Sequence, residues 1–173
     1  MNVRNAVLPD AEAIRRLIDE HVGDGTLLPR SLPEICENIR DFVVAEERGV
    51  LVGCAALHLY GEHLAEIRSI AVLPRARGRG AGTKLVKALL REAGRHGVQC
   101  VCLFTRIPEF FARLGFKVTH QALPDKLYKD CRRCPRRHAC DEIAMIRGEL
   151  PVAEPIAALH KIRRPILAAG GGR

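Results

Sequence analysis

The chain of 173 residues contains no run of about 18 apolar residues, so the sequence predicts no membrane-spanning helix. Its first ten residues become polar by the fourth position, unlike a secretory signal, and we therefore expect a cytoplasmic protein. In that compartment the seven cysteines are expected to be thiols or metal ligands rather than disulfides. Tryptophan is absent and aromatic residues make up 4% of the chain, which leaves few stacking platforms for single-stranded nucleic acid.

Positive charge is what the chain has in excess, with a formal net charge of +8 from 28 Lys and Arg against 20 Asp and Glu. The charge is local: residues 74–91 hold six basic side chains and no acidic one, and a second basic cluster lies at 129–137. A basic chain favours phosphate-bearing partners. Because the first cluster lies on a glycine-rich turn, it favours a small phosphorylated ligand over a long nucleic acid.

Apolar periodicity and turn residues predict an α/β layered domain with a mixed sheet. The first residues of the segment 50–60 are nearly all apolar, which predicts a central strand covered on both faces. We expect one domain over residues 1–148, including a cysteine-rich loop at 129–141, and a partly disordered tail at 149–173. The expected strands are residues 2–8, 42–46, 50–60, 66–72, 98–105, 116–121 and 142–147. One helix is expected directly after Asp10, and three more are expected over residues 31–41, 83–94 and 108–114.

The glycine-rich turn at residues 77–82 lies between an apolar strand and a strong helix. Its backbone N–H groups and the helix dipole can hold a phosphate or pyrophosphate. A P-loop would need a Gly-Lys-Ser/Thr ending, which is absent, and a dinucleotide turn would need the spacing G-x-G-x-x-G. The acetyl-CoA turn, R/Q-x-x-G-x-G/A, fits Arg77, Gly80 and Gly82. The remaining alternative is a glycine-rich loop without a ligand.

The residues 65–67, 71–74 and the turn resemble the signature strand, turn and helix of the GCN5-related N-acetyltransferase (GNAT) superfamily. Phe110 and Phe111, followed by Gly115 and Phe116, are similar to its second motif. The resemblance covers roughly residues 2–121. It implies a mixed sheet splayed between its fourth and fifth strands, helices on both faces and acetyl-CoA in the gap. The cofactor-binding residues that it implies are Ile70, Ala71, Val72, Arg77, Gly78, Arg79, Gly80, Ala81, Gly82, Thr83 and Phe111.

The same resemblance offers catalytic roles. Glu66 stands where many family members keep the general base, which takes a proton from the acceptor ammonium directly or through water. The alternative is a strand-edge carboxylate paired with Arg68. Many members use a tyrosine as the general acid for the CoA thiolate, and Phe111 occupies that position here. Thr105 or Tyr128 could substitute, or the thiolate could leave unaided or through water, since a thiol pKa near 8.5 makes it a fair leaving group.

Further segments resemble the acetyltransferase domain of N-acetylglutamate synthase, an amino-acid N-acetyltransferase that starts arginine biosynthesis. They are residues 25–31 and 41–44, the strand at 53–57, the paired phenylalanines, and Leu123 with Lys126 and Tyr128. The kinase domain of the long enzymes is absent, so the chain resembles the short, free-standing form. The resemblance implies L-glutamate as the acceptor, with Arg30 on one carboxylate and Lys126 or Arg68 on the other. The alternative for Arg30 is a solvated loop residue.

Cys131, Cys134, His138 and Cys140 place three thiols and an imidazole within ten residues. One C-x-x-C pair is a common half of a structural zinc site, and His138 with Cys140 could complete a tetrahedron. Structural zinc is therefore one interpretation, and reduced cysteines or a redox pair are the others. The remaining cysteines lie on apolar elements and are expected in the core.

Two rival functions remain open. One is a GNAT enzyme for another amine, such as a protein N-terminus or a polyamine, although a polyamine would need an acidic pocket. The other is a regulatory or nucleic-acid-binding module that uses the basic cysteine loop and shows salt-dependent binding. The residues 53–60 and the tail are the segments that could support a homodimer.

Overall fold

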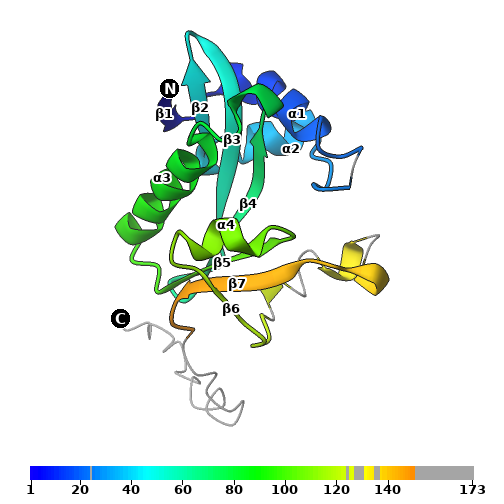
Figure 1. Cartoon of the computed structure of the whole chain (residues 1–173), viewed down its shortest axis with the longest axis vertical. Coiled ribbons are helices and arrows are strands. Elements are labelled where there is room, and N and C mark those ends of the chain that lie inside the picture. The colour runs from blue at the N-terminus through cyan, green and yellow to red at the C-terminus, as the bar shows by residue number, and fades with distance from the viewer. Residues whose placement is uncertain (24, 124, 127–130, 135–136, 151–173) are drawn as a thin grey trace, which may run out of the picture.

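The computed structural model describes residues 1–23, 25–123, 125–126, 131–134 and 137–150 (Figure 1). The predicted tail beyond residue 150 therefore lies outside the described residues. The strands are β1 (Asn2–Asn5), β2 (Phe42–Glu47), β3 (Val50–Leu59), β4 (Ala65–Val72), β5 (Cys100–Thr105), β6 (Lys117–Val118) and β7 (Ile143–Gly148). The α-helices are α1 (Ala11–Asp19), α2 (Leu32–Glu37), α3 (Ala81–Arg95) and α4 (Pro108–Ala112).

The strands form one seven-stranded mixed sheet in the order β1-β2-β3-β4-β5-β7-β6. The pair β4 and β5 is parallel, and the other adjacent pairs are antiparallel. The prediction of a mixed α/β fold is confirmed. As predicted, β3 is buried along most of its length. It lies between β2 and β4, so it is an inner strand rather than a sheet edge to which a second copy could add.

Helices cover both faces of the β1–β4 half, with α3 on one side and α1 and α2 on the other (Figure 1). Alternation along β2 explains the two layers, because successive side chains of a strand point to opposite faces. Val43 packs in the core with Leu85 and Leu89 of α3, whereas Val44 packs with Ile14 of α1 and Ile35 of α2. Among the helices of the described residues, none combines the length and apolar character that crossing a bilayer requires.

Several predicted elements are shorter in the structure, and the strand expected over 2–8, for example, ends at Asn5. The helix expected over 31–41 stops at Glu37 and is followed by a 3₁₀ turn over Ile39–Asp41. The C-cap of this helix is Asn38, whose backbone leaves the helical region with a φ of −106° and a ψ of 21°. Its backbone N–H still donates to the carbonyl of Glu34 at 3.2 Å, and its side-chain amide donates to the same carbonyl at 2.7 Å. The strand expected over 116–121 pairs with β7 only at Lys117 and Val118.

The parallel strands β4 and β5 diverge, as the family resemblance implied. They pair at Ala65 with Val101 and at Glu66 with Cys102, although β4 continues to Val72 and β5 to Thr105. The register of β4 against β3 also shifts between Cys54 and Ala56, next to Ser69, which has a φ of 52°. Such a bulge bends its strand and re-aims the neighbouring side chains. Glu66 therefore marks the vertex of a V-shaped gap in the sheet.

The β5–β7 pair depends on a glycine at its far end. Gly148 has a φ of 99°, and an added Cβ would lie 2.2 Å from the carbonyl oxygen of Gln99. We expect Gly148→Ala to lower the free energy of unfolding by about 3 kcal/mol, because the strand must shift and the backbone is strained. The matched control is Gly94→Ala in α3, where an added Cβ meets nothing within 4 Å. That change should stabilise by roughly 0.5–1 kcal/mol. Urea denaturation of both variants measures the difference, and equal stabilities would contradict this account.

Candidate active site

A cleft of about 720 Å³ opens where β4 and β5 diverge. Ile67, Ser69 and Ile70 line it from β4, and Leu103 and Thr105 line it from β5. Its far wall is the start of α3 and the turn before it. The gap between the strands is thus continuous with the N-terminus of a long helix, where backbone N–H groups favour an anion.

Glycines shape the turn at that helix end. Gly78 and Gly80 have φ values of 71° and 84°, which side-chain-bearing residues rarely adopt, and Gly80 is the N-cap of α3. At Gly82 an added Cβ would lie 3.2 Å from the ring of Phe110, so this position is also tight. The turn can therefore bring bare backbone N–H groups against a pyrophosphate, and its residues fit the CoA group that the family resemblance implied.

The cofactor-binding residues inferred from the sequence fall into two groups. Those that line the cleft are Ile70, Val72, Arg77, Gly78, Gly80, Ala81, Gly82, Thr83 and Phe111. Arg79 and Ala71 are not among the described residues of the cleft wall. Arg79 instead donates to both oxygens of Glu47, at 3.0 and 2.7 Å. The side chain of Ala71 is buried in the core beneath α1.

The charge of the cleft is positive. Arg68, Arg77, Arg106 and Arg113 line it, and Glu142 is the one carboxylate among its described lining residues. Arg106 is partly neutralised because its guanidinium donates to Asp141 at 2.7 Å, a hydrogen bond that raises the pKa of the arginine. A cationic cleft attracts the phosphates of CoA and an anionic acceptor, and it disfavours a polycation.

Glu66 is buried, with 2% of the residue exposed. Each carboxylate oxygen has a donor: the hydroxyl of Tyr60 donates to Oε2 at 2.7 Å, and Nζ of Lys126 donates to Oε1 at 2.6 Å. The structure thus pairs two residues that the sequence analysis had treated separately, the candidate base and a candidate carboxylate ligand. Breaking such a buried pair is costly unless both partners find new ones.

Neither Glu66 nor Lys126 is among the described residues of the cleft wall. Nζ of Lys126 lies 5.3 Å from the ring centre of Phe104, which does line the cleft, so the pair lies next to the cleft wall. The preceding residue, Asp125, lies 3.0 Å from Nε2 of His63, which ties this segment to the β3–β4 connection. A proton that leaves an acceptor in the cleft would therefore reach Glu66 through water or after Lys126 moves.

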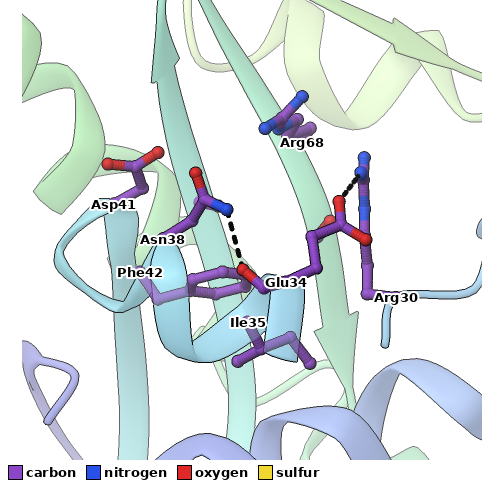
Figure 2. Close-up of a pocket in the computed structure, with 9 residues that line it drawn as sticks. Arg30, Glu34, Ile35, Asn38, Asp41, Phe42 and Arg68 are labelled. Carbon is purple, nitrogen blue, oxygen red and sulfur yellow. Dashed lines mark hydrogen bonds and ion pairs between the residues drawn. The ribbon is translucent and has the colours of Figure 1, made fainter. Parts of the chain in front are cut away.

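A second, smaller recess lies on the α2 side of the sheet (Figure 2). It is lined by Arg30 and by Arg68, and Arg68 also lines the cleft, so the two hollows share this residue. Figure 2 shows both arginines on one side of the recess, with Asn38 and Asp41 on the other. Arg30, which precedes α2, forms an ion pair with Glu34 in the first turn of that helix. Of the two predicted arginines, Arg68 therefore lies in the cleft wall and Arg30 lies in the adjoining recess, where Glu34 holds it in place.

The candidates for protonating the leaving thiolate are only partly described. Phe111 lies in the cleft wall, buried between Phe110 and Phe116. Thr105 also lines the cleft, and its Oγ1 accepts a hydrogen bond from the backbone N–H of Ile107 at 3.0 Å. Its hydroxyl proton is left to donate. Tyr128 lies outside the described residues.

The cysteine cluster does not form a metal site in the part of the chain that the structure describes. No group of three or more His, Cys, Asp or Glu side chains there is placed to hold a metal ion. Nε2 of His138 instead accepts a hydrogen bond from Arg137 at 2.8 Å. All seven cysteines are free thiols. The prediction of structural zinc therefore finds no support in the geometry.

Burial makes the core cysteines poor nucleophiles. It raises the pKa of the Cys54 thiol to about 12 and that of Cys100 to about 11, and it also raises the pKa of Cys102. At pH 8 only about one Cys54 in ten thousand would be a thiolate. We expect iodoacetamide at pH 8 to alkylate the exposed Cys140 in the native protein and to spare Cys54, Cys100 and Cys102 until denaturant is added. Peptide mass mapping measures this, and rapid native labelling of Cys100 would contradict it.

Tyr60 and several residues of the cleft wall, including His21, Thr26 and Ile107, were not predicted from the sequence. A signal for Tyr60 was present, because Tyr60 and Glu66 flank the short connection between two consecutive strands. The backbone N–H of Tyr60 donates to the carbonyl of Leu64 at 3.0 Å and closes that turn. The cleft-wall residues carry no motif, since their positions follow from the path of loops.

Comparison with known proteins identifies the family of the chain. The model of the Acetyltransferase (GNAT) family matches residues 13–116. An uncharacterized N-acetyltransferase of Chlorobaculum tepidum is 44% identical over 146 residues, which cover 84% of this chain and 94% of that protein. An amino-acid acetyltransferase of Mycobacterium tuberculosis is 41% identical over 117 residues, which cover 66% of this chain and 67% of that protein.

A solved structure shares the fold and has CoA bound. The N-acetylglutamate synthase of Neisseria gonorrhoeae, complexed with coenzyme A and N-acetyl-glutamate, superposes with a TM-score of 0.73 at 29% identity. The match covers 85% of this chain and 34% of the synthase, so this chain spans about a third of that protein. With the family model matching more than half of its residues, the chain belongs to the GNAT family, as an N-acetyltransferase that uses acetyl-CoA.

Proposed function

We propose that this chain transfers the acetyl group of acetyl-CoA to the α-amino group of L-glutamate. The observation that carries the proposal is the grouping of Glu66, Lys126 and two arginines beside the cleft. Relatives named amino-acid acetyltransferase and a synthase structure with bound N-acetyl-glutamate support the same acceptor.

The charges suit an acceptor with one ammonium and two carboxylates. Arg68 lines both the cleft and the recess, and Arg30 lines the recess with 18% of its side chain exposed. Arginine binds carboxylates through two parallel hydrogen bonds, so this pair can hold one carboxylate of glutamate. Lys126 is then the cation for the other carboxylate. An acceptor without carboxylates would gain nothing from these cations.

Binding would exchange the partners of the Glu66–Lys126 pair. The acceptor ammonium approaches Glu66, and an acceptor carboxylate draws away Lys126. Each buried charge then keeps a counter-charge, which avoids the penalty of leaving one unpaired. A simple amine would compete with Lys126 for Glu66 and offer Lys126 no carboxylate in exchange, so the pair favours amino acids over plain amines.

Once the acceptor is in place, Glu66 takes one proton from its ammonium, directly or through a water. The neutral nitrogen attacks the thioester carbonyl carbon, the C–N bond forms, and the C–S bond breaks as the electron pair leaves with sulfur. After the attack the nitrogen still carries a second proton to be lost, and this proton passes through water to the CoA thiolate, to which the Thr105 hydroxyl can donate a hydrogen bond. Because the thiol pKa is near 8.5, this departure does not require a tyrosine acid.

Release of free CoA thiol from acetyl-CoA tests the acceptor. The assay runs with the twenty amino acids, spermidine, 4-aminobutyrate and the α-amide of glutamate. We expect turnover to be greatest with L-glutamate, and 4-aminobutyrate and the α-amide to be poor because each lacks the α-carboxylate. Turnover with another amine at equal or higher kcat/KM would replace the glutamate proposal and keep the acetyltransferase.

A further inference from the structure

Both oxygens of the candidate base are occupied by donors of different character. Oε1 faces the cation of Lys126, and Oε2 accepts from the neutral hydroxyl of Tyr60. We propose that Tyr60 is a positioning residue for Glu66: its hydroxyl holds Oε2 and so presents Oε1 to the acceptor amine. This inference deepens the proposed function and rests on Glu66 being its base.

The position of Tyr60 is set by the hairpin and not by the cleft. Its backbone is tied to Leu64, and its ring packs edge-on to His58 with the ring centres 4.9 Å apart. The ring also packs on a buried cluster that includes Leu64, Cys102 and Leu123. A tyrosine side chain that is packed on several sides has few rotamers open to it, so its hydroxyl can fix the orientation of the carboxylate to which it donates.

The two donors differ in what they can do during turnover. Lys126 is charged, and the proposed exchange moves it to an acceptor carboxylate. Tyr60 is neutral and needs no counter-charge, so it can keep its hydrogen bond while Lys126 leaves. A buried carboxylate that lost every donor would pay a desolvation penalty. The Tyr60 hydroxyl removes part of that penalty and keeps Oε1 aimed at one place.

Tyr60 should also bias the protonation of the base. A hydrogen bond donated to a carboxylate favours its ionised form. Among the described residues, the other titratable groups beside Glu66 are His58, opposite it on β3, Cys102, opposite it on β5, and Arg68, two residues along β4. His58 lies 4.0 Å from Asp41. Lys126 is the cation on Oε1, and none of these described groups substitutes for a neutral donor on Oε2.

Kinetics of Tyr60→Phe test the inference. We expect kcat/KM for the acceptor to fall about tenfold, with KM for acetyl-CoA unchanged. The acid limb of the kcat/KM profile should move to higher pH by roughly one unit, because the ionised carboxylate loses a donor. A merely structural effect would lower activity at every pH without moving that limb. An acid limb that stays in place would overturn the proposal.

A ¹⁹F NMR titration tests the contact between Tyr60 and Glu66 without requiring catalytic turnover. The chain has two tyrosines, so Tyr128→Phe leaves one site, Tyr60, for 3-fluorotyrosine and a single ¹⁹F resonance. We expect this resonance to titrate with the same midpoint as the acid limb. The titration should vanish in Glu66→Gln and persist in His58→Phe, which keeps the ring contact and removes the imidazole. A titration that survives Glu66→Gln would show that Tyr60 does not sense the base, and would overturn the proposal.

The kinetic and the ¹⁹F experiments together distinguish a failure of this inference from a failure of the proposed function. If no amino acid is acetylated, the glutamate proposal fails, and the ¹⁹F titration still decides whether Tyr60 acts on Glu66. If glutamate is acetylated but Tyr60→Phe behaves as the parent enzyme, the proposed function stands and the positioning role of Tyr60 is overturned.

Discussion

Replacing Glu66 with glutamine is expected to lower kcat by about 10²–10⁴-fold, because general-base catalysis contributes that much to such reactions. Binding of acetyl-CoA should be unchanged, since Glu66 is not among the described residues of the cleft wall. Steady-state kinetics and calorimetric titration with CoA measure the two effects. The matched control is Glu92→Gln on α3, where the carboxylate pairs with Arg95 and His96 on the surface and kcat should be preserved.

The same change should also destabilise the fold. It leaves the ammonium of Lys126 without its counter-charge at a site where the lysine side chain is 13% exposed. We expect a loss of about 3 kcal/mol in the free energy of unfolding. Adding Lys126→Met should restore most of that stability, because removing both charges of a buried pair is often neutral, but it should not restore kcat. A Glu66→Gln variant with parental kcat would remove Glu66 as the base.

Replacing Arg30 with methionine is expected to raise KM for L-glutamate by about 10- to 100-fold, with KM for acetyl-CoA unchanged. A hydrogen bond between charged groups contributes about 1.5–3 kcal/mol, and 1.4 kcal/mol is a factor of ten. Loss of the Arg30–Glu34 pair should cost at most about 1 kcal/mol of stability, since such helix pairs are weak. The measurement is a saturation curve in each substrate.

Arg40→Met is the matched control for that prediction. Arg40 lies in the neighbouring 3₁₀ turn and is exposed, and it does not belong to the described lining of either hollow. Its KM for glutamate should equal that of the parent enzyme. Equal effects of the two substitutions would mean that overall positive charge, and not a bound carboxylate at Arg30, explains the change.

Local patterns were sufficient to predict the phosphate turn. Gly78 and Gly80 adopt the left-handed backbone that their lack of a side chain permits, and the helix after them begins at Ala81. The resemblance to a known family supplied the gap between β4 and β5. The turn could be predicted because it is a short segment whose conformation is dictated by its own residues.

The surroundings of Glu66 could not be predicted in the same way. The Lys126 contact joins residues sixty positions apart and depends on the path of the chain after β6. Arg79 has the right spacing for a phosphate ligand, yet a glutamate on the β2–β3 hairpin pairs with it. Long-range ion pairs of this kind depend on how elements pack, and spacing along the chain does not reveal them.

The most direct test of the central claim follows the acetyl carbon itself. Acetyl-CoA labelled with ¹³C at the carbonyl is mixed with enzyme and L-glutamate, and ¹³C NMR identifies where the label goes. The account predicts a single new amide resonance, that of N-acetyl-L-glutamate, growing at the rate of thiol release and nearly abolished by Glu66→Gln. Label that appears on the protein, on another amine or only in acetate would contradict direct transfer to glutamate.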